Sequence, residues 1–321
     1  MDSKKDKNFI RIVTITIVLT YLVILAGTVV RTTQSGMGCP DWPKCFGQWV
    51  PPTDESQLPA NYQEIYAHRG YADTTFSAYH TWVEYVNRLL GVLVGLSIFA
   101  TVLASFRYWK TDKLVVFLSF ISFVLVGFQG WLGALVVASN LAPIKITTHM
   151  LVALLLVALL IYILYRVKFK GKQETIFENK IKYVLYIVII LSIIQVIFGT
   201  QVRQEIDVIA KQNNFLLRET WIDSLSSIFL VHRSFSILVF AANVMLIYNV
   251  IKSKIASSKI ISTLKWVGIV LFIEILSGIV LAYFSVPKAM QPTHLLFASI
   301  LFGIQFYLFL QLFFSKAVKS A

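Results

Sequence analysis

The sequence predicts an all-α polytopic membrane protein with eight transmembrane helices, arranged as two tandem, pseudo-symmetric four-helix bundles. Three observations lead to this prediction: an apolar composition, eight apolar stretches of membrane-spanning length, and an internal repeat that relates the two halves. The 321 residues are 57% hydrophobic and 14% charged. Because a soluble chain carries roughly a quarter charged residues, this composition argues against a soluble enzyme.

The transmembrane helices are predicted from the apolar stretches. A helix that crosses a bilayer needs about 20 predominantly apolar residues. The segments that meet this requirement are 10–30, 81–105, 114–138, 148–166, 182–203, 225–250, 264–286 and 293–314. The first is too long for a signal peptide and lacks a clear cleavage site, so we expect it to be a retained helix.

The net charge of +13 reports topology once the charges are sorted by segment. The termini and the loops on their side hold nineteen Lys and Arg against five acids, whereas the opposite segments hold ten of each sign. Under the positive-inside rule this asymmetry predicts a multi-pass protein of the plasma (inner) membrane with both termini in the cytoplasm. The bases are then orientation signals in short loops, so the bilayer is an expected partner and nucleic acid is not.

The longest outer loop, about residues 31–79, contains both cysteines, Cys39 and Cys45, in a proline-rich stretch. On the oxidising side of a membrane such a pair can form a disulfide, either structural or redox-active. A metal site is disfavoured because only His68 lies nearby as a further ligand.

An internal repeat with an offset of 145 residues relates the two halves. It aligns Thr148-His149 with Thr293-His294 and Asn87-Arg88 with His232-Arg233, and it aligns Gly133 with Gly278. A Gly-Thr-x-Val-Arg motif also occurs in both halves, at residues 27–31 and 199–203. The repeat predicts two domains, residues 1–170 and 171–321.

Three of the five histidines occupy repeated positions near the outer ends of predicted helices. A lone histidine there is more often an interfacial residue, but repeated polar residues within membrane helices are usually functional. We expect His232 and His294 to face each other within one predicted bundle, because paired imidazoles across a bundle interior hold a b-type haem in this way. We therefore predict that His232 and His294 are axial ligands of a haem iron.

The N-terminal half has a different set of residues at these positions. It keeps His149 but has Asn87 where the repeat predicts a histidine, and Glu84 lies one helical turn from Asn87. A site with one imidazole and a neighbouring carboxylate leaves one face of a haem open to chemistry. The competing interpretation of Glu84 is an ion pair with Arg88, four residues later, which does not exclude catalysis.

Four arginines lie at the predicted outer helix ends and are candidate partners of haem propionates, because guanidinium groups bind carboxylates in a bidentate manner. They are Arg31, Arg88, Arg203 and Arg233. Ordinary snorkelling of arginine to the membrane surface is the alternative.

Taken together, these motifs resemble those of the haem A synthases over nearly the whole chain. The resemblance rests on Gly-Thr-x-Val-Arg at 27–31, on the Glu84-Tyr-Val-Asn-Arg88 stretch, on Thr148-His149, on Val231-His232-Arg233 and on Pro292-Thr293-His294. It implies oxidation of a methyl group of haem O to a formyl group, giving the haem A of cytochrome oxidase. It also implies haem b between His232 and His294, substrate haem O beside His149, and catalysis by the residue at Glu84.

The resemblance further implies a haem O synthase and cytochrome oxidase assembly factors as partners. The electron donor or acceptor is not identified, and both a monomer and a homo-oligomer stay open. Many members of the family read Glu-x-x-His-Arg where this chain has Asn87, so Asn87 is expected to orient the substrate by hydrogen bonding or to leave His149 as the sole ligand.

Two other classes of protein fit part of the pattern. A di-haem b-type cytochrome would transfer electrons without changing the haem, but it has no need of Glu84 or of an open axial site. A haem transport or assembly protein would bind haem reversibly through His149, yet a second, bis-histidine site would then be superfluous.

Overall fold

The computed structural model describes residues 3–169, 179–254 and 256–313. Its long helices are α1 (Ser3–Thr32), α3 (Ala78–Ser105), α4 (Lys113–Ala138), α5 (Pro143–Phe169), α6 (Asn179–Gln212), α7 (Ser227–Lys252), α8 (Ser258–Tyr283) and α9 (Met290–Phe313). Each of these eight helices is long and apolar enough to cross a membrane. The chain is therefore an all-α polytopic membrane protein, as the sequence predicts.

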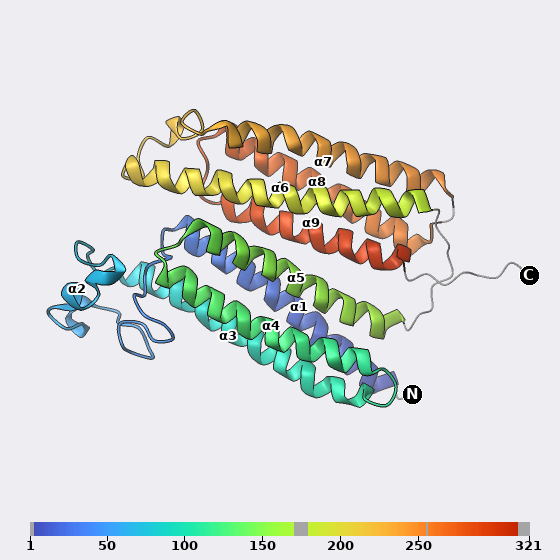
Figure 1. Cartoon of the computed structure of the whole chain (residues 1–321), viewed down its shortest axis with the longest axis horizontal. Coiled ribbons are helices and arrows are strands. Elements are labelled where there is room, and N and C mark those ends of the chain that lie inside the picture. Colours follow the sequence, from blue (N-terminus) through green and yellow to red (C-terminus); the bar gives the residue numbers. More distant parts are fainter. Residues whose placement is uncertain (1–2, 170–178, 255, 314–321) are drawn as a thin grey trace, which may run out of the picture. The chain divides into compact units, whose positions relative to one another are not determined.

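The chain forms two compact units, Met1–Leu156 and Val157–Ala321. In the first unit α1 and α4 pack against α3, and in the second α6 packs against α7 and α9 while α8 packs against α9. Figure 1 shows the helices within each unit running alongside one another. The predicted boundary between residues 170 and 171 lies outside the described residues, so the division into domains at that point and the pseudo-symmetry stay predictions.

Three of the long helices, α3, α7 and α8, begin at a serine side-chain cap. The hydroxyl oxygens of Ser77, Ser226 and Ser257 accept hydrogen bonds from backbone N–H groups in the first turns of α3, α7 and α8. Such caps satisfy amide groups that a helix start leaves without a partner. Because α3, α5, α8 and α9 start several residues before the predicted apolar stretches, the site residues lie inside well-formed helix rather than at frayed ends.

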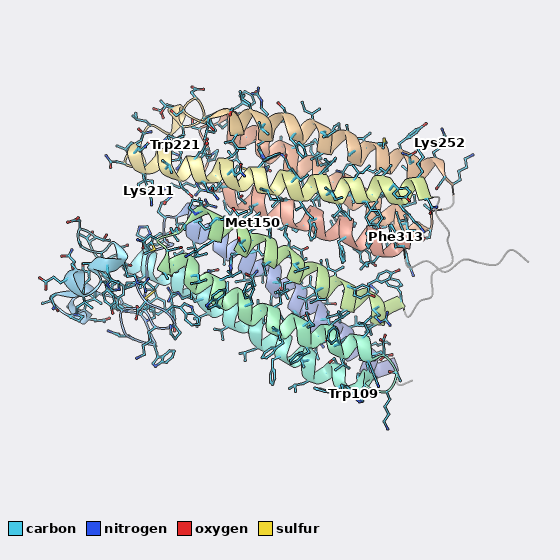
Figure 2. All side chains as sticks on the ribbon, in the orientation of Figure 1. Trp109, Met150, Lys211, Trp221, Lys252 and Phe313 are labelled. Atoms are coloured by element: carbon cyan, nitrogen blue, oxygen red, sulfur yellow. A yellow bond between two sulfur atoms is a disulfide. The ribbon has the colours of Figure 1, made fainter. Side chains whose placement is uncertain are left out.

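Helix α6 runs nine residues past its predicted end at residue 203. The extra turns are amphipathic: Ile206 and Ala210 are buried against Trp221 in the following loop, while most of the other positions are polar. Figure 2 labels Trp221, whose indole N–H donates to the Leu216 carbonyl at 2.9 Å. A search for apolar stretches misses such a segment because only one face of it is apolar.

The long loop between α1 and α3 has a small core of its own. It contains α2 (Tyr62–Ile65) and three-residue 3₁₀ helices at Glu55–Gln57 and Ala67–Arg69. The Phe46 ring makes edge contacts with Tyr62, Tyr66 and Tyr71 at centroid distances of 5.6–6.2 Å. This aromatic cluster gives the loop a fixed shape, and the loop lies against the first turns of α3.

Candidate functional site

Glu84 is buried in the second turn of α3, with 3% of its surface exposed. Its Oε1 accepts a hydrogen bond from Nε of Arg88 at 3.1 Å, and a second guanidinium nitrogen contacts the same oxygen. The ion pair that the i, i+4 spacing predicts is therefore present. Because both side chains are largely buried, each charge depends on the other for compensation.

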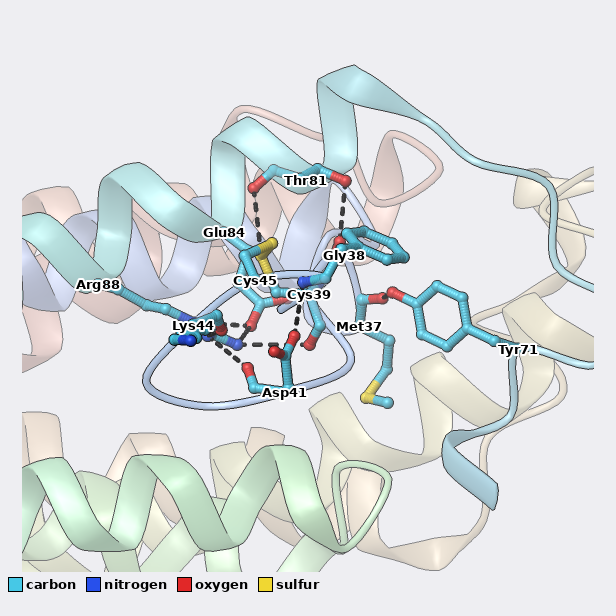
Figure 3. Close-up of polar contacts among 11 residues, drawn as sticks. Met37, Gly38, Cys39, Asp41, Lys44, Cys45, Tyr71, Thr81, Glu84 and Arg88 are labelled. Atoms are coloured by element: carbon cyan, nitrogen blue, oxygen red, sulfur yellow. Dashed lines mark hydrogen bonds and ion pairs between the residues drawn. A yellow bond between two sulfur atoms is a disulfide. The ribbon is translucent and has the colours of Figure 1, made fainter. Parts of the chain in front are cut away.

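The long loop between α1 and α3 closes over this ion pair (Figure 3). The backbone N–H of Cys39 donates to the Glu84 Oε2 at 3.0 Å. Arg88 donates to the backbone carbonyls of Asp41 at 2.7 Å, Lys44 at 3.0 Å and Cys39 at 3.4 Å. Arg88 thus connects the carboxylate of Glu84 to three points on the loop, so the loop and α3 position Glu84 together.

A disulfide joins Cys39 to Cys45, as the sequence allows, and both residues are fully buried. The carboxylate of Asp41 accepts hydrogen bonds from the backbone N–H groups of Phe46 at 2.6 Å and Gly47 at 2.8 Å. The bridge and this carboxylate close the short loop whose carbonyls Arg88 binds. A redox role for the cysteine pair stays a prediction.

Gly38 allows the loop to approach the backbone of α3. The Thr81 hydroxyl donates to the Gly38 carbonyl at 2.8 Å, and a Cβ at Gly38 would lie only 2.3 Å from the His80 carbonyl oxygen. On the other side, the Tyr71 hydroxyl donates to the Met37 carbonyl. Burial raises the pKa of Tyr71, so this hydroxyl stays a donor at neutral pH.

His232 and His294 come together in the second unit, from α7 and α9. Their ring centroids are 6.4 Å apart and the ring planes are nearly perpendicular, at 83°. A metal–imidazole bond of about 2 Å on each side, plus roughly 1 Å from ring nitrogen to ring centre, gives roughly 6 Å between the centres. The separation therefore fits two axial ligands of one iron.

Each of these imidazoles packs against a glycine of a neighbouring helix. A Cβ at Gly199 of α6 would lie 3.2 Å from Cε1 of His232, and one at Gly278 of α8 would lie 3.3 Å from Cε1 of His294. A larger residue would force either ring to shift by a few tenths of an ångström. Glycine at both positions therefore fixes where the rings lie.

The first unit has corresponding contacts at the positions that the repeat aligns. A Cβ at Gly133 of α4 would lie 3.8 Å from Cε1 of His149, and one at Gly27 of α1 would lie 3.8 Å from Oδ1 of Asn87. The Asn87 Oδ1 and the His149 Nδ1 are buried and have no hydrogen-bond partner among the described residues. Asn87 thus takes a glycine-backed position like those of the histidines, and both side chains keep a polar atom available for a ligand.

Glutamine side chains bind the backbone of two of the histidines. Nε2 of Gln129 donates to the His149 carbonyl at 2.9 Å, and Nε2 of Gln195 donates to the His232 carbonyl at 3.1 Å. Neither glutamine was predicted from the sequence as a site residue. The signal was present, since each glutamine precedes its glycine by four residues.

An apolar groove of about 560 Å³ lies between α1 and α3 in the first unit. Its walls include Leu22 and Val29 of α1 and Trp82 and Val86 of α3, and Asn87 also lines it. The groove therefore gives the Asn87 position an apolar neighbourhood suited to a hydrophobic ligand.

The four candidate propionate-binding arginines have different surroundings. Arg88 is occupied by Glu84 and the loop, as described above. Arg203 pairs with Asp207 at 2.5 Å, and the Arg233 guanidinium lies 5.8 Å from the ring of Phe229. Arg31 is partly buried in the last turn of α1. A role in binding propionates stays a prediction for all four.

Comparison with known proteins gives matches over most of the chain. The family described as cytochrome oxidase assembly protein matches residues 10–306. A protein named "Heme A synthase" from Wolbachia pipientis is 24% identical, covering 90% of this chain and 88% of the relative. One of the same name from Bacillus mycoides is 27% identical, and the match covers 89% of this chain and 88% of the relative.

A third protein of that name, from Shewanella oneidensis, is 32% identical over 154 residues. That match covers 48% of this chain, and this chain spans only 44% of that relative. The family match over residues 10–306, by contrast, includes all the candidate site residues.

Proposed function

This chain belongs to the cytochrome oxidase assembly protein family, and on that premise we propose that it is a haem A synthase. The proposed enzyme is an oxidoreductase that converts a methyl group of haem O into a formyl group. The names of the long-matching relatives support this activity. The observation that carries the proposal is the difference between two similar sites. In each unit two polar side chains pack against glycines of neighbouring helices. In the second unit both are imidazoles, whereas in the first unit one is an imidazole and the other is the amide of Asn87.

We assign the resident cofactor, haem b, to the second unit. The 6.4 Å separation of the His232 and His294 rings fits axial ligation of one iron. A haem held there would supply a one-electron carrier. The chain's own contribution is to fix both imidazoles, through Gly199, Gly278 and the Gln195 bond to the His232 backbone.

Substrate haem O is assigned to the first unit, with His149 as the ligand on one side. Asn87 cannot replace a histidine as a strong iron ligand, so its amide orients the substrate and leaves that side open. The unpartnered Oδ1 of Asn87 supports this role. The apolar groove beside Asn87 provides the hydrophobic surroundings that a haem requires.

Glu84 is the proposed catalytic residue. Its carboxylate relays protons released from the methyl group or stabilises a cationic intermediate, and Arg88 and the Cys39 amide keep it in one orientation. Preorganised charge in a water-poor site is an effective means of lowering a barrier. The ion pair with Arg88 is therefore part of the proposed site.

The remaining assignments follow the charge distribution and the family. We place the protein in the plasma (inner) membrane with both termini in the cytoplasm and the chemistry near the outer face. Arg31, Arg203 and Arg233 are proposed propionate partners, and Arg88 contributes through Glu84. A haem O synthase and cytochrome oxidase assembly factors are the proposed protein partners.

The test is to express the chain together with a haem O synthase in a host that makes no haem A. Extracted pigments are then separated by reversed-phase chromatography with mass detection. A haem A peak is expected. Haems B and O alone, with two haems retained by the purified protein, would instead indicate a di-haem cytochrome. Haem bound reversibly without any product would indicate a transport protein.

A further inference from the structure

Glu274, in the middle of α8, is a buried acidic residue to which the proposed function gives no role. Its side chain is 16% exposed, and its Oε2 is buried without a hydrogen-bond partner among the described residues. An acidic group within a membrane helix is costly and is usually retained for a function. Its other oxygen, Oε1, lies 3.2 Å from Nδ1 of His294.

Two side-chain oxygens lie against Nδ1 of His294. The Ser277 hydroxyl oxygen is 2.9 Å from this nitrogen and also 2.9 Å from the Glu274 backbone carbonyl oxygen, and Oε1 of Glu274 is 3.2 Å from the same nitrogen. Nε2 is therefore the nitrogen left for an iron ion, and an imidazole bound to iron through Nε2 would carry its proton on Nδ1, facing these two oxygen acceptors.

This arrangement distinguishes His294 from the two other candidate ligands. Nδ1 of His149 and Nδ1 of His232 have no hydrogen-bond partner among the described residues. The residues at the same spacing before the packing glycine are Gln129 and Gln195, which bind the backbone carbonyl of the histidine rather than its ring. Of these three imidazoles, His294 is the one with a carboxylate at Nδ1.

A carboxylate that accepts the Nδ1 proton of a metal-bound imidazole makes that imidazole a stronger electron donor. Stronger donation to the iron favours the ferric state over the ferrous state. We propose that Glu274 is a positioning residue that acts through His294 to lower the reduction potential of the haem held by His232 and His294. This inference rests on the proposed function, because it requires a haem b at that site.

The test is a spectroelectrochemical titration of the b-type haem in the purified full-length protein and three variants. Glu274→Gln keeps the shape and removes the carboxyl group, Glu274→Asp keeps the carboxyl group, and Ser277→Ala removes the hydroxyl acceptor alone. For Glu274→Gln we expect the ferric-to-ferrous equilibrium to shift at least tenfold toward ferrous, which is about 59 mV for a one-electron couple. Glu274→Asp and Ser277→Ala should each shift the potential by less than half as much.

The outcomes separate this inference from the proposed function. An unchanged potential in Glu274→Gln, or equal shifts in the Gln and Asp variants, would overturn the role of Glu274 and leave the haem assignment intact. Loss of haem from the Gln variant with retention by the Asp variant would support the need for a carboxylate, whereas loss from both would count against it. A wild-type protein without b-type haem would overturn the assigned site and this inference with it.

Discussion

Gly38→Ala tests whether the disulfide loop positions Glu84. The added Cβ would lie 2.3 Å from the His80 carbonyl oxygen and 2.8 Å from the Thr81 backbone nitrogen. Both are helix backbone atoms that cannot turn aside, so the loop must retreat by about 1 Å to reach an ordinary contact distance. That retreat stretches the Thr81 bond to the Gly38 carbonyl, now 2.8 Å, and the Cys39 bond to Glu84, now 3.0 Å.

The expected cost follows from these two bonds. A hydrogen bond to a charged group contributes about 1.5–3 kcal/mol and a neutral one about 0.5–1.5 kcal/mol. We therefore expect Gly38→Ala to lower the free energy of unfolding by roughly 2–4.5 kcal/mol, measured by denaturant titration of the purified protein in detergent. Conversion of haem O should fall in parallel, because Glu84 loses its amide donor.

Gly36→Ala is the matched control, in the same loop. Its Cβ would meet only the side chain of Leu141, at 3.1 Å, and a flexible leucine can move. Ordinary surface substitutions change the free energy of unfolding by up to about 0.5 kcal/mol. If the free energies of unfolding of the Gly38→Ala and Gly36→Ala proteins differed by no more than this, the proposed close packing of loop and helix would be refuted.

Four further substitutions test the two candidate sites. Glu84→Gln should abolish haem A formation, because the amide cannot carry the proton or the charge; full conversion in the pigment assay would contradict its catalytic role. Arg88→Met should lower the free energy of unfolding by about 3–5 kcal/mol, since it leaves a buried carboxylate unpaired; an unchanged denaturation midpoint would show that the pair contributes little. His232→Ala should remove the b-type absorption band of the purified protein, and retention of a normal band would exclude this ligand. Gly199→Ala should weaken haem retention during purification, because the new Cβ would lie 3.2 Å from Cε1 of His232. Gly133→Ala should be tolerated, because its Cβ would lie 3.8 Å from Cε1 of His149. Equal haem retention in both variants would argue against the crowding.

The sequence was sufficient to predict the eight helices because each contains an apolar stretch long enough to cross a bilayer. It was not sufficient for the last nine residues of α6, whose stability depends on packing against Trp221. Nor did apolarity alone reveal where α5 and α8 begin, since caps and polar first turns extend a helix beyond its apolar part.

The candidate site was predictable where the signal lay in side-chain identity and spacing. The repeat singled out Asn87 and the histidines as candidates, the one-turn spacing from Asn87 singled out Glu84, and the i, i+4 rule predicted the Arg88 ion pair. The loop contacts were not predictable, because Arg88 binds backbone carbonyls. Every residue has a backbone carbonyl, so the sequence does not indicate which of them Arg88 binds. Ser277 was missed for a similar reason, since a serine among apolar residues gives no indication of its partner.

The central claim is that this chain converts haem O into haem A, and a mass balance on the purified protein tests it most directly. The protein is reconstituted with haem O and an electron-accepting redox mediator in air-saturated buffer, because forming a formyl group from a methyl group removes electrons and adds an oxygen atom. Both haems are quantified over time by chromatography with mass detection. The account predicts that haem O disappears as haem A appears in equal molar amount, and that Glu84→Gln protein shows neither change. Haem O that stays unchanged in the presence of correctly folded, haem b-containing protein would contradict it.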